Sequence, residues 1–344
     1  MGNVGFKVKL ASCPIPAKKT QKRVRVMTER NRRELLKTAA AVSLARVCTT
    51  KVSAASDPPR RKFTMDLSCG MIGVRADGRE AIRLAHKYGF ESVAPDSGLL
   101  ARLSDEQLRE VQADMKAKNL VWGAAGLSAD FRGDQSKFKA SAKRLAGEAT
   151  ALKRAGVTRV GTWISPAHRS LTYRANFRLH AHRLRELAKI LADHGQRLGL
   201  EYVGPKTSWT AAQYPFIHTM AEAKELIAEI SLDNVGLMLD SWHWYNARET
   251  AEDLLSLKGR DVVCCHLNDA PSGVPVDQQR DLRRELPAAT GVIDLKAFLG
   301  SLLKIGYDGP ISAEPFSREL REMSTEDAVG ATAAAMEKAF SLVA

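Results

Sequence analysis

The chain is poor in the features that mark membrane proteins and disulfide-rich proteins. It has no stretch of about 18 uncharged apolar residues, so we expect no transmembrane helix and no stable membrane association. Its five cysteines are scattered, contain no CxxC pair and indicate no disulfide framework. Cys264 and Cys265 are adjacent on an expected strand, so their side chains should point to opposite faces of the sheet.

The main part of the chain also lacks net charge, although the whole chain carries +13. Residues 1–62 hold 16 Lys and Arg against 3 Asp and Glu, and this surplus equals the net charge of the whole chain. Residues 63–344 are therefore neutral, which argues against a surface that binds nucleic-acid phosphates. We expect no nucleic-acid partner.

The basic N-terminal segment, residues 1–62, has two interpretations. NRRELLK at 31–37, the modest apolar stretch TAAAVSLA and the small residues before Asp57 resemble a twin-arginine signal peptide, which would make the protein exported or periplasmic. Arg46 interrupts the apolar region, and about 26 residues precede Met27, which could be the true start. Alternatively, the segment is a disordered basic tail on a cytoplasmic protein.

Residues 63–344 alternate regularly between short apolar runs and amphipathic stretches. Strands are expected near 65–73, 91–95, 120–127, 159–164, 198–203, 235–240, 262–268 and 309–315. Helices are expected around 81–88, 108–115, 136–155, 175–195, 219–230, 248–257, 294–305 and 324–342. Eight such units in about 280 residues predict an α/β fold, a (β/α)8 TIM barrel. A doubly wound sheet is the alternative, but the glycines of GMIGVRADG do not have the dinucleotide-binding spacing.

Four of the expected strands end in side chains that bind metal ions. Strands five to eight end at Glu201, Asp240, His266 and Glu314, and strand ends share one rim of a TIM barrel. Taken singly, each has an ordinary interpretation as a helix cap, a surface group or a core histidine. Together, three carboxylates and an imidazole suit one divalent cation such as Mn, Co, Mg or Zn. Without a cation, the three carboxylates would repel one another.

This pattern, Glu…Asp-x-x-His…His…Glu, resembles the xylose isomerase-like barrel family of sugar isomerases and epimerases. The resemblance covers most of residues 65–340. It implies that Glu201, Asp240, His266 and Glu314 are the metal ligands. It also implies that Glu201 and Glu314 are catalytic and exchange the proton of the reacting carbon, and that His243 binds a substrate oxygen.

Other candidates for substrate binding are less well defined. Lys206 follows Glu201 closely and could supply a positive group, and Trp242 adjoins the expected mouth of the site. The epimerases of the family carry an Arg soon after the strand-seven His, whereas the corresponding stretch here, NDAPSGVP, has none. Arg280, Arg283 and Arg284 in the insert 270–293 are candidates to replace it.

The resemblance implies a divalent-metal-dependent isomerase or epimerase of a small sugar or polyol. The reaction would be proton abstraction α to a carbonyl through a metal-stabilised enediolate. An inosose-dehydratase-like lyase on the same site and a non-catalytic carbohydrate-binding barrel are the alternatives. A metal-dependent endonuclease of the related barrel group is disfavoured by the neutral body and the few strand-end histidines. Whether the barrel forms a homo-oligomer stays open.

Overall fold

The structure is a computed structural model that describes residues 61–344. All but the last two residues of the expected leader, residues 1–62, lie outside this described part. Within residues 61–344, no helix is both long enough and apolar enough to cross a bilayer.

The centre of the fold is a nine-stranded parallel sheet. Its strands are β1 (Thr64–Leu67), β2 (Ser92–Val93), β3 (Val121–Trp122), β4 (Ala125–Gly126), β5 (Arg159–Trp163), β7 (Arg197–Glu201), β9 (Val235–Asp240), β10 (Val262–Leu267) and β11 (Pro310–Ala313). The order in the sheet is β3-β2-β1-β11-β10-β9-β7-β5-β4. The two outer strands are pieces of one run, residues 121–126, so the sheet closes on itself and the TIM barrel prediction is confirmed.

The third expected strand is split because its middle residues do not pair. A Cβ atom at Gly123 would collide with the Asp66 carboxylate of β1, so only glycine fits there. The half before this point pairs with β2, and the half after it pairs with β5.

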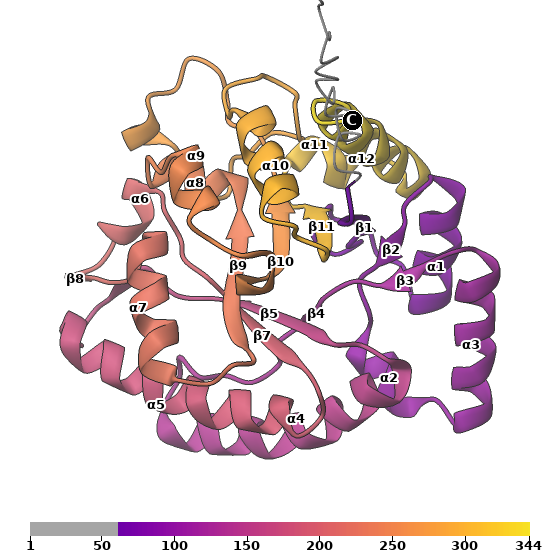
Figure 1. Ribbon diagram of the computed structural model, residues 1–344, viewed down its shortest axis with the longest axis horizontal. Helices are drawn as coiled ribbons and strands as arrows, with labels where there is room; N and C mark the ends of the chain where they lie inside the picture. The colour runs from indigo at the N-terminus through magenta and orange to yellow at the C-terminus, as the bar shows by residue number, and fades with distance from the viewer. Residues whose placement is uncertain (1–60) are drawn as a thin grey trace, which may run out of the picture. The chain divides into compact units, whose positions relative to one another are not determined.

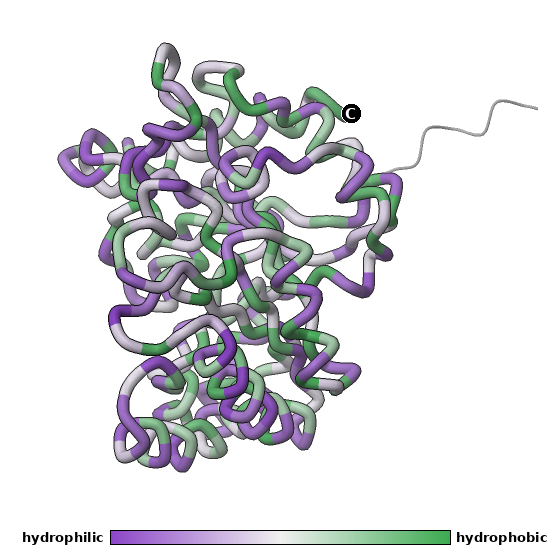
Figure 2. The backbone as a smooth tube through the Cα atoms, turned by 90° about the vertical axis from the view of Figure 1, so that its left-hand side faces the viewer, coloured by the Kyte–Doolittle hydropathy of each residue, from purple (hydrophilic) through white to green (hydrophobic). Residues whose placement is uncertain are grey.

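Helices cover the outside of the sheet (Figure 1). They are α1 (Gly78–Lys87), α3 (Asp105–Ala117), α4 (Gln135–Ala155), α5 (Tyr173–Ala192), α7 (Met220–Ile230), α9 (Ala251–Leu255), α10 (Leu295–Lys304) and α12 (Thr325–Phe340). Hydrophilic and hydrophobic residues alternate along the helical coils (Figure 2), as expected for helices with one face on a sheet.

The expected helix boundaries follow from local chemistry. Ser104 caps α3, because its Oγ accepts a hydrogen bond from the backbone N–H of Gln107. In return, the Gln107 Oε1 accepts a hydrogen bond from the backbone N–H of Ser104. Asp294 caps α10 through the Ala297 N–H, and Gly306 follows this helix with a φ of 75°. The observed α10 agrees with the expected helix 294–305, whereas α3 begins three residues before the expected 108–115 because Ser104 caps it there.

Short elements lie between the strands and the long helices. They are α2 (Ser97–Arg102), α6 (Lys206–Trp209), α8 (Ser241–Asn246), α11 (Arg318–Glu322), the 3-10 turns Gly259–Asp261 and Val276–Gln278, and a small antiparallel pair of β6 (Ala167–His168) with β8 (Tyr214–Pro215). Most of these short elements follow the carboxyl end of a strand, so they form the rim around the mouth of the barrel.

The apolar core has two parts. The larger part lies between the sheet and the helices and includes Cys265. The smaller part fills the barrel interior and consists of Met238, Val263 and Cys264 with Ala124. The adjacent cysteines thus face opposite sides of β10, as predicted, and both are free thiols.

Candidate metal centre

Four metal-binding side chains meet at the carboxyl ends of four adjacent strands. Glu201 ends β7, Asp240 ends β9, His266 lies near the end of β10, and Glu314 follows β11 directly. His266 pairs in register with Asp240, so these two side chains leave the sheet side by side. The neighbouring positions in the strand order explain why residues up to 113 positions apart in the sequence converge here.

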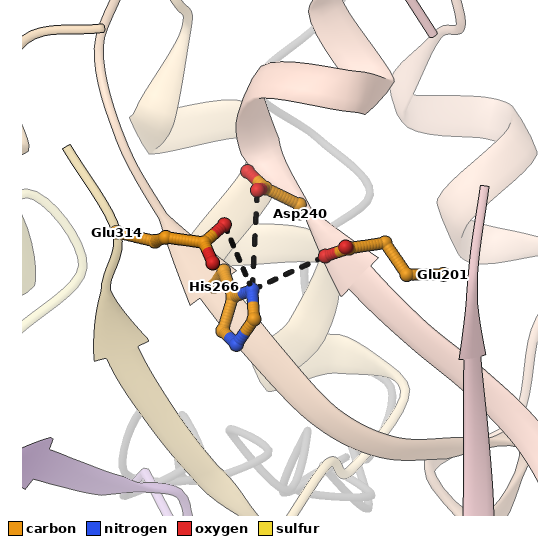
Figure 3. Close-up of side chains that lie close together, drawn as sticks. All are labelled: Glu201, Asp240, His266 and Glu314. Carbon is orange, nitrogen blue, oxygen red and sulfur yellow. Dashed lines mark hydrogen bonds and ion pairs between the residues drawn. The ribbon is translucent and has the colours of Figure 1, made fainter. Parts of the chain in front are cut away.

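The donor atoms of the four residues all lie within 4.8 Å of one another. His266 Nδ1 lies 3.1 Å from Glu201 Oε1, 3.4 Å from Glu314 Oε2 and 4.0 Å from Asp240 Oδ2. Figure 3 shows the three carboxylates pointing toward this nitrogen from separate strands. Glu201, Asp240 and His266 are buried, and only Glu314 retains partial exposure. The structure therefore brings together all four residues that the sequence analysis selected.

Burial and mutual repulsion leave these carboxylates in need of positive charge. Burial raises the pKa of Glu201, and the neighbouring carboxylates of Glu314 and Asp240 raise it further. For Glu314, burial acts to raise the pKa, but the positive charges of His266 and Arg284 outweigh it and hold the pKa low. Burial opposes the charging of His266, yet the adjacent Glu314 and Glu201 raise its pKa well above the usual value.

The donor set fits a divalent cation. Three carboxylates and one imidazole supply oxygen and nitrogen donors of the kind that Mn, Co, Mg and Zn accept. The thiols of Cys264 and Cys265 pack in apolar clusters, and neither belongs to the donor group found within residues 61–344. The clustering of buried like charges is the structural observation that a bound cation would explain.

Asn268, which the sequence analysis did not select, orients two of the four donors. Its side-chain amide donates to Asp240 Oδ1 at 2.9 Å, and its Oδ1 accepts the backbone N–H of Glu314 at 3.1 Å. Its own backbone N–H donates to Ser241 Oγ at 2.8 Å. Asn268 is fully buried. The sequence feature that could have identified it is its position two residues after His266, at the end of the same strand.

Arg284 enters the cluster from the insert 270–293. Its Nη1 donates to Asp240 Oδ2 at 2.7 Å and to Glu314 Oε2 at 2.8 Å. Its Nη2 donates to Asp281 Oδ1 at 2.8 Å, which fixes the guanidinium from the insert side. Of the three arginines considered, only Arg284 is buried in the site, while Arg280 and Arg283 are exposed and line a surface hollow.

His243 faces the same space with an uncharged ring. Its Nδ1 accepts the backbone N–H of Gly204 at 3.3 Å, and its Nε2 lies 3.5 Å from Arg284 Nη2. Nε2 also lies 3.9 Å from Glu201 Oε2 and 4.0 Å from Asp240 Oδ2. Burial, the largest influence, and the nearby Arg284 lower the pKa of His243 to about 3. The imidazole is therefore uncharged at neutral pH and faces the site through Nε2.

Comparison with known proteins places this site in a family. Residues 82–339 match the model of the xylose isomerase-like TIM barrel. The chain belongs to this family.

Three family relatives illustrate the range of similarity. An inosose isomerase of Bacillus licheniformis is 31% identical over 147 residues, which are 42% of this chain and 49% of that protein. The chain thus spans about half the length of this curated relative. A xylose isomerase domain protein of Alicyclobacillus acidocaldarius is 28% identical, with 82% of this chain and 99% of that chain covered and a TM-score of 0.72. The IolI protein with a bound zinc atom shares the fold at 22% identity, 81% and 98% coverage and a TM-score of 0.68.

In this member of the xylose isomerase-like family, the two other expected substrate contacts lie in different places. Lys206 is exposed and forms an ion pair with Asp277 at 3.2 Å. Trp242 is fully buried in α8, and its backbone N–H donates to Asp240 Oδ1 at 2.7 Å. The Arg284 guanidinium lies 5.6 Å from the Trp242 ring centre. Trp242 therefore packs beside Arg284 at the cluster, whereas Lys206 is engaged on the surface.

A different tryptophan lines the mouth. Trp163 ends β5, pairs in register with Glu201 and is 47% exposed. Residues paired across neighbouring strands project to the same face, so its indole borders the space beside Glu201. The sequence could have identified Trp163, because it lies near the end of the expected strand 159–164 just as Glu201 lies near the end of the next one.

Proposed function

We propose that this chain is a divalent-metal-dependent isomerase or epimerase of a sugar or polyol that moves the proton on the carbon next to a carbonyl. The observation that carries the proposal is the convergence of Glu201 and Glu314 on one cluster with Asp240 and His266. The inosose isomerase relatives support the same reaction class.

Glu201, Asp240, His266 and Glu314 are the residues that would hold the cation. The zinc atom named for the IolI protein supports a divalent ion at such a site. When bound, the cation supplies Lewis-acid stabilisation of the negative charge that develops on the substrate oxygens.

The two glutamates divide the proton transfer between them. The Arg284 guanidinium, 2.8 Å from Glu314 Oε2, favours the ionised carboxylate, so Glu314 is suited to accept the proton from the substrate carbon. Glu201 lies across the cluster from Glu314 (Figure 3), so it is suited to return a proton. Return from the opposite side inverts the carbon, whereas return to the adjacent carbon isomerises the substrate.

The surrounding side chains orient the reacting groups. His243 faces a substrate oxygen beside Glu201 through its Nε2. Arg284 fixes the carboxylates of Asp240 and Glu314 through two hydrogen bonds from one nitrogen. Asn268 holds the same two residues from the opposite side, so the base keeps a single orientation.

The test is exchange of the substrate α-hydrogen with solvent deuterium, followed by NMR across a panel of ketoses, inososes and carboxylated analogues of both. We expect the metal-loaded wild type to incorporate deuterium into at least one of them. Glu314→Gln should reduce the rate by at least a hundredfold, while the exposed control Glu322→Gln should leave it unchanged. Exchange that persists in Glu314→Gln contradicts the assignment of the base, and loss of water to form a C=C bond would assign the lyase chemistry instead.

A further inference from the structure

A second arginine, Arg132, stands at the rim of the site on the side away from Arg284. It lies in the loop after β4, and its guanidinium is sandwiched between two aromatic rings. The guanidinium carbon is 4.2 Å from the ring centre of Phe131 and 4.1 Å from that of Trp163. Its Nη2 donates to Thr162 Oγ1 at 3.1 Å and to the Trp163 carbonyl. The guanidinium is thus held in one orientation over the end of β5.

This position is one strand away from the metal centre. Trp163 pairs with Glu201, and the Ile164 N–H donates to the Glu201 carbonyl at 2.8 Å. Neighbouring strands are about 4.8 Å apart, so the guanidinium over Trp163 lies next to the Glu201 side of the site. The negative charge of the Glu201 carboxylate accordingly acts to raise the pKa of Arg132.

Arg132 differs from the other cations near the site in lacking an acidic partner. Arg284 is balanced by Asp240, Asp281 and Glu314, each within 2.8 Å. Lys206 is paired with Asp277. No carboxylate oxygen of residues 61–344 lies within 4.0 Å of the Arg132 guanidinium, and within this range its buried Nε has no hydrogen-bond partner.

Asp130, the acidic residue closest to Arg132 in the sequence, forms no ion pair with its guanidinium. Asp130 Oδ1 accepts the backbone N–H groups of Arg132 at 3.1 Å and Gly133 at 2.9 Å, so it closes the turn. Burial is the main influence on Arg132 and lowers its pKa to about 10, which still leaves it charged at neutral pH. The charges of Asp130 and Glu201 act on Arg132 from a distance, but a half-buried cation without an ion pair in contact is unfavourable, and a ligand that supplies one reduces this cost.

We propose that Arg132 binds a carboxylate of the substrate, so that the substrate is a carboxylated polyol ketone and not a neutral sugar. The inference rests on the proposed function, because it extends the same site by one subsite. Within residues 61–344 the Nη1 hydrogens of Arg132 have no acceptor, since Nη2 is used by Thr162 and Trp163, so Nη1 can donate to a carboxylate, and one positive charge balances one carboxylate. The carboxylate would lie beside Trp163, with the reacting carbon toward Glu201 and Glu314.

The experiment measures binding, not turnover, by calorimetric titration of the full metal-loaded chain. The probes are shikimate, a carboxylated cyclic triol, and myo-inositol, a neutral cyclic polyol, with fructose 6-phosphate as the phosphate probe. We expect wild type to bind shikimate at least tenfold more tightly than myo-inositol. Arg132→Gln should remove that preference, Arg132→Lys should retain part of it, and the exposed control Arg283→Gln should leave it unchanged.

Several outcomes overturn the inference. These are equal binding of shikimate and myo-inositol by wild type, no measurable binding of shikimate, or a preference that survives in Arg132→Gln. An equal loss for both probes in Arg132→Gln would show a structural role, and a loss confined to fructose 6-phosphate would show a phosphate subsite. Deuterium exchange in wild type on neutral ketoses, together with any of these outcomes, would leave the proposed function standing while the carboxylate subsite fails.

Discussion

At the scale of single residues, Asn268 joins the two strands that carry Asp240 and Glu314. Its amide nitrogen donates to the Asp240 carboxylate, and its amide oxygen accepts the backbone N–H of Glu314. Both partners are largely buried. Mutation of residues that orient metal ligands through hydrogen bonds typically weakens metal affinity by about ten- to a hundredfold.

We predict that Asn268→Ala weakens divalent metal binding by about ten- to a hundredfold. It should also cost about 1–3 kcal/mol of unfolding free energy, because a buried acceptor and donor lose their partner. Asn234→Ala is the matched control, since Asn234 donates to the carbonyls of Ala188 and Gln196 at the opposite end of β9. Metal titration and urea unfolding separate the two effects. Equal metal affinity in both variants would show that Asn268 does not orient the ligands.

Single residues also show what the sequence could and could not predict. The convergence of Glu201, Asp240, His266 and Glu314 was predictable because each ends an apolar run, and the barrel fold brings all strand ends to one rim. Arg284 was only one of three candidates, since its position depends on how a 24-residue insert folds. The burial of Trp242 was not predictable, because residue type alone does not say which side of α8 faces the core.

At the scale of elements, the insert 270–293 is tied to the barrel by one carboxylate. Asp269 accepts the backbone N–H groups of Ala270, Thr290, Gly291 and Ile293 at 2.7–3.0 Å, so it clamps both ends of the insert. The insert in turn carries Arg284 into the site. The packing of this one loop therefore controls the charge around Asp240 and Glu314.

We predict that Asp269→Ala loosens the insert without unfolding the barrel. Trypsin should cleave after Arg280 or Arg283 at least tenfold faster than in wild type, because cleavage requires local opening of the loop. The control is Asp294→Ala, which removes the acceptor of one backbone N–H at the start of α10, near the same loop. We expect it to lower the free energy of unfolding by about 1 kcal/mol. A cleavage rate no faster in Asp269→Ala than in this control would contradict the clamp.

The element pattern itself was largely predictable. All eight expected helices are present, and the expected strands form the barrel. The split in the third strand was not predictable, since it arises where Asp66 from β1 leaves room only for Gly123. The short helices after the strands were missed because segments of four to six residues carry little periodic signal.

At the scale of the whole molecule, a buried histidine makes stability depend on pH. His180 on α5 lies between the rings of Phe131 and Phe216, at 5.5 and 4.9 Å between centres. Its Nδ1 hydrogen-bonds the Asn176 carbonyl at 3.0 Å. Burial, the main cause, and the nearby charge of Arg132 and Arg183 lower its pKa to about 4.

We predict that unfolding free energy falls as the pH drops from about 6.5 to about 4. In this window the unfolded chain binds a proton at His180 while the folded chain does not, so acid favours unfolding by up to about 3 kcal/mol. His180→Gln should remove that part of the slope in urea unfolding between pH 4 and 7. His182→Gln, at an exposed position of the same helix, should not. Parallel pH profiles for wild type and His180→Gln would contradict the prediction.

The account as a whole depends on one divalent cation held by Glu201, Asp240, His266 and Glu314. Elemental analysis of the purified full chain, after incubation with Mn, Co, Mg or Zn and removal of free metal, tests this most directly. We expect about one ion per wild-type chain and almost none in the Glu201→Gln, Glu314→Gln double variant, with both proteins folded by circular dichroism. Wild type without bound metal, or a double variant that retains it, would contradict the account.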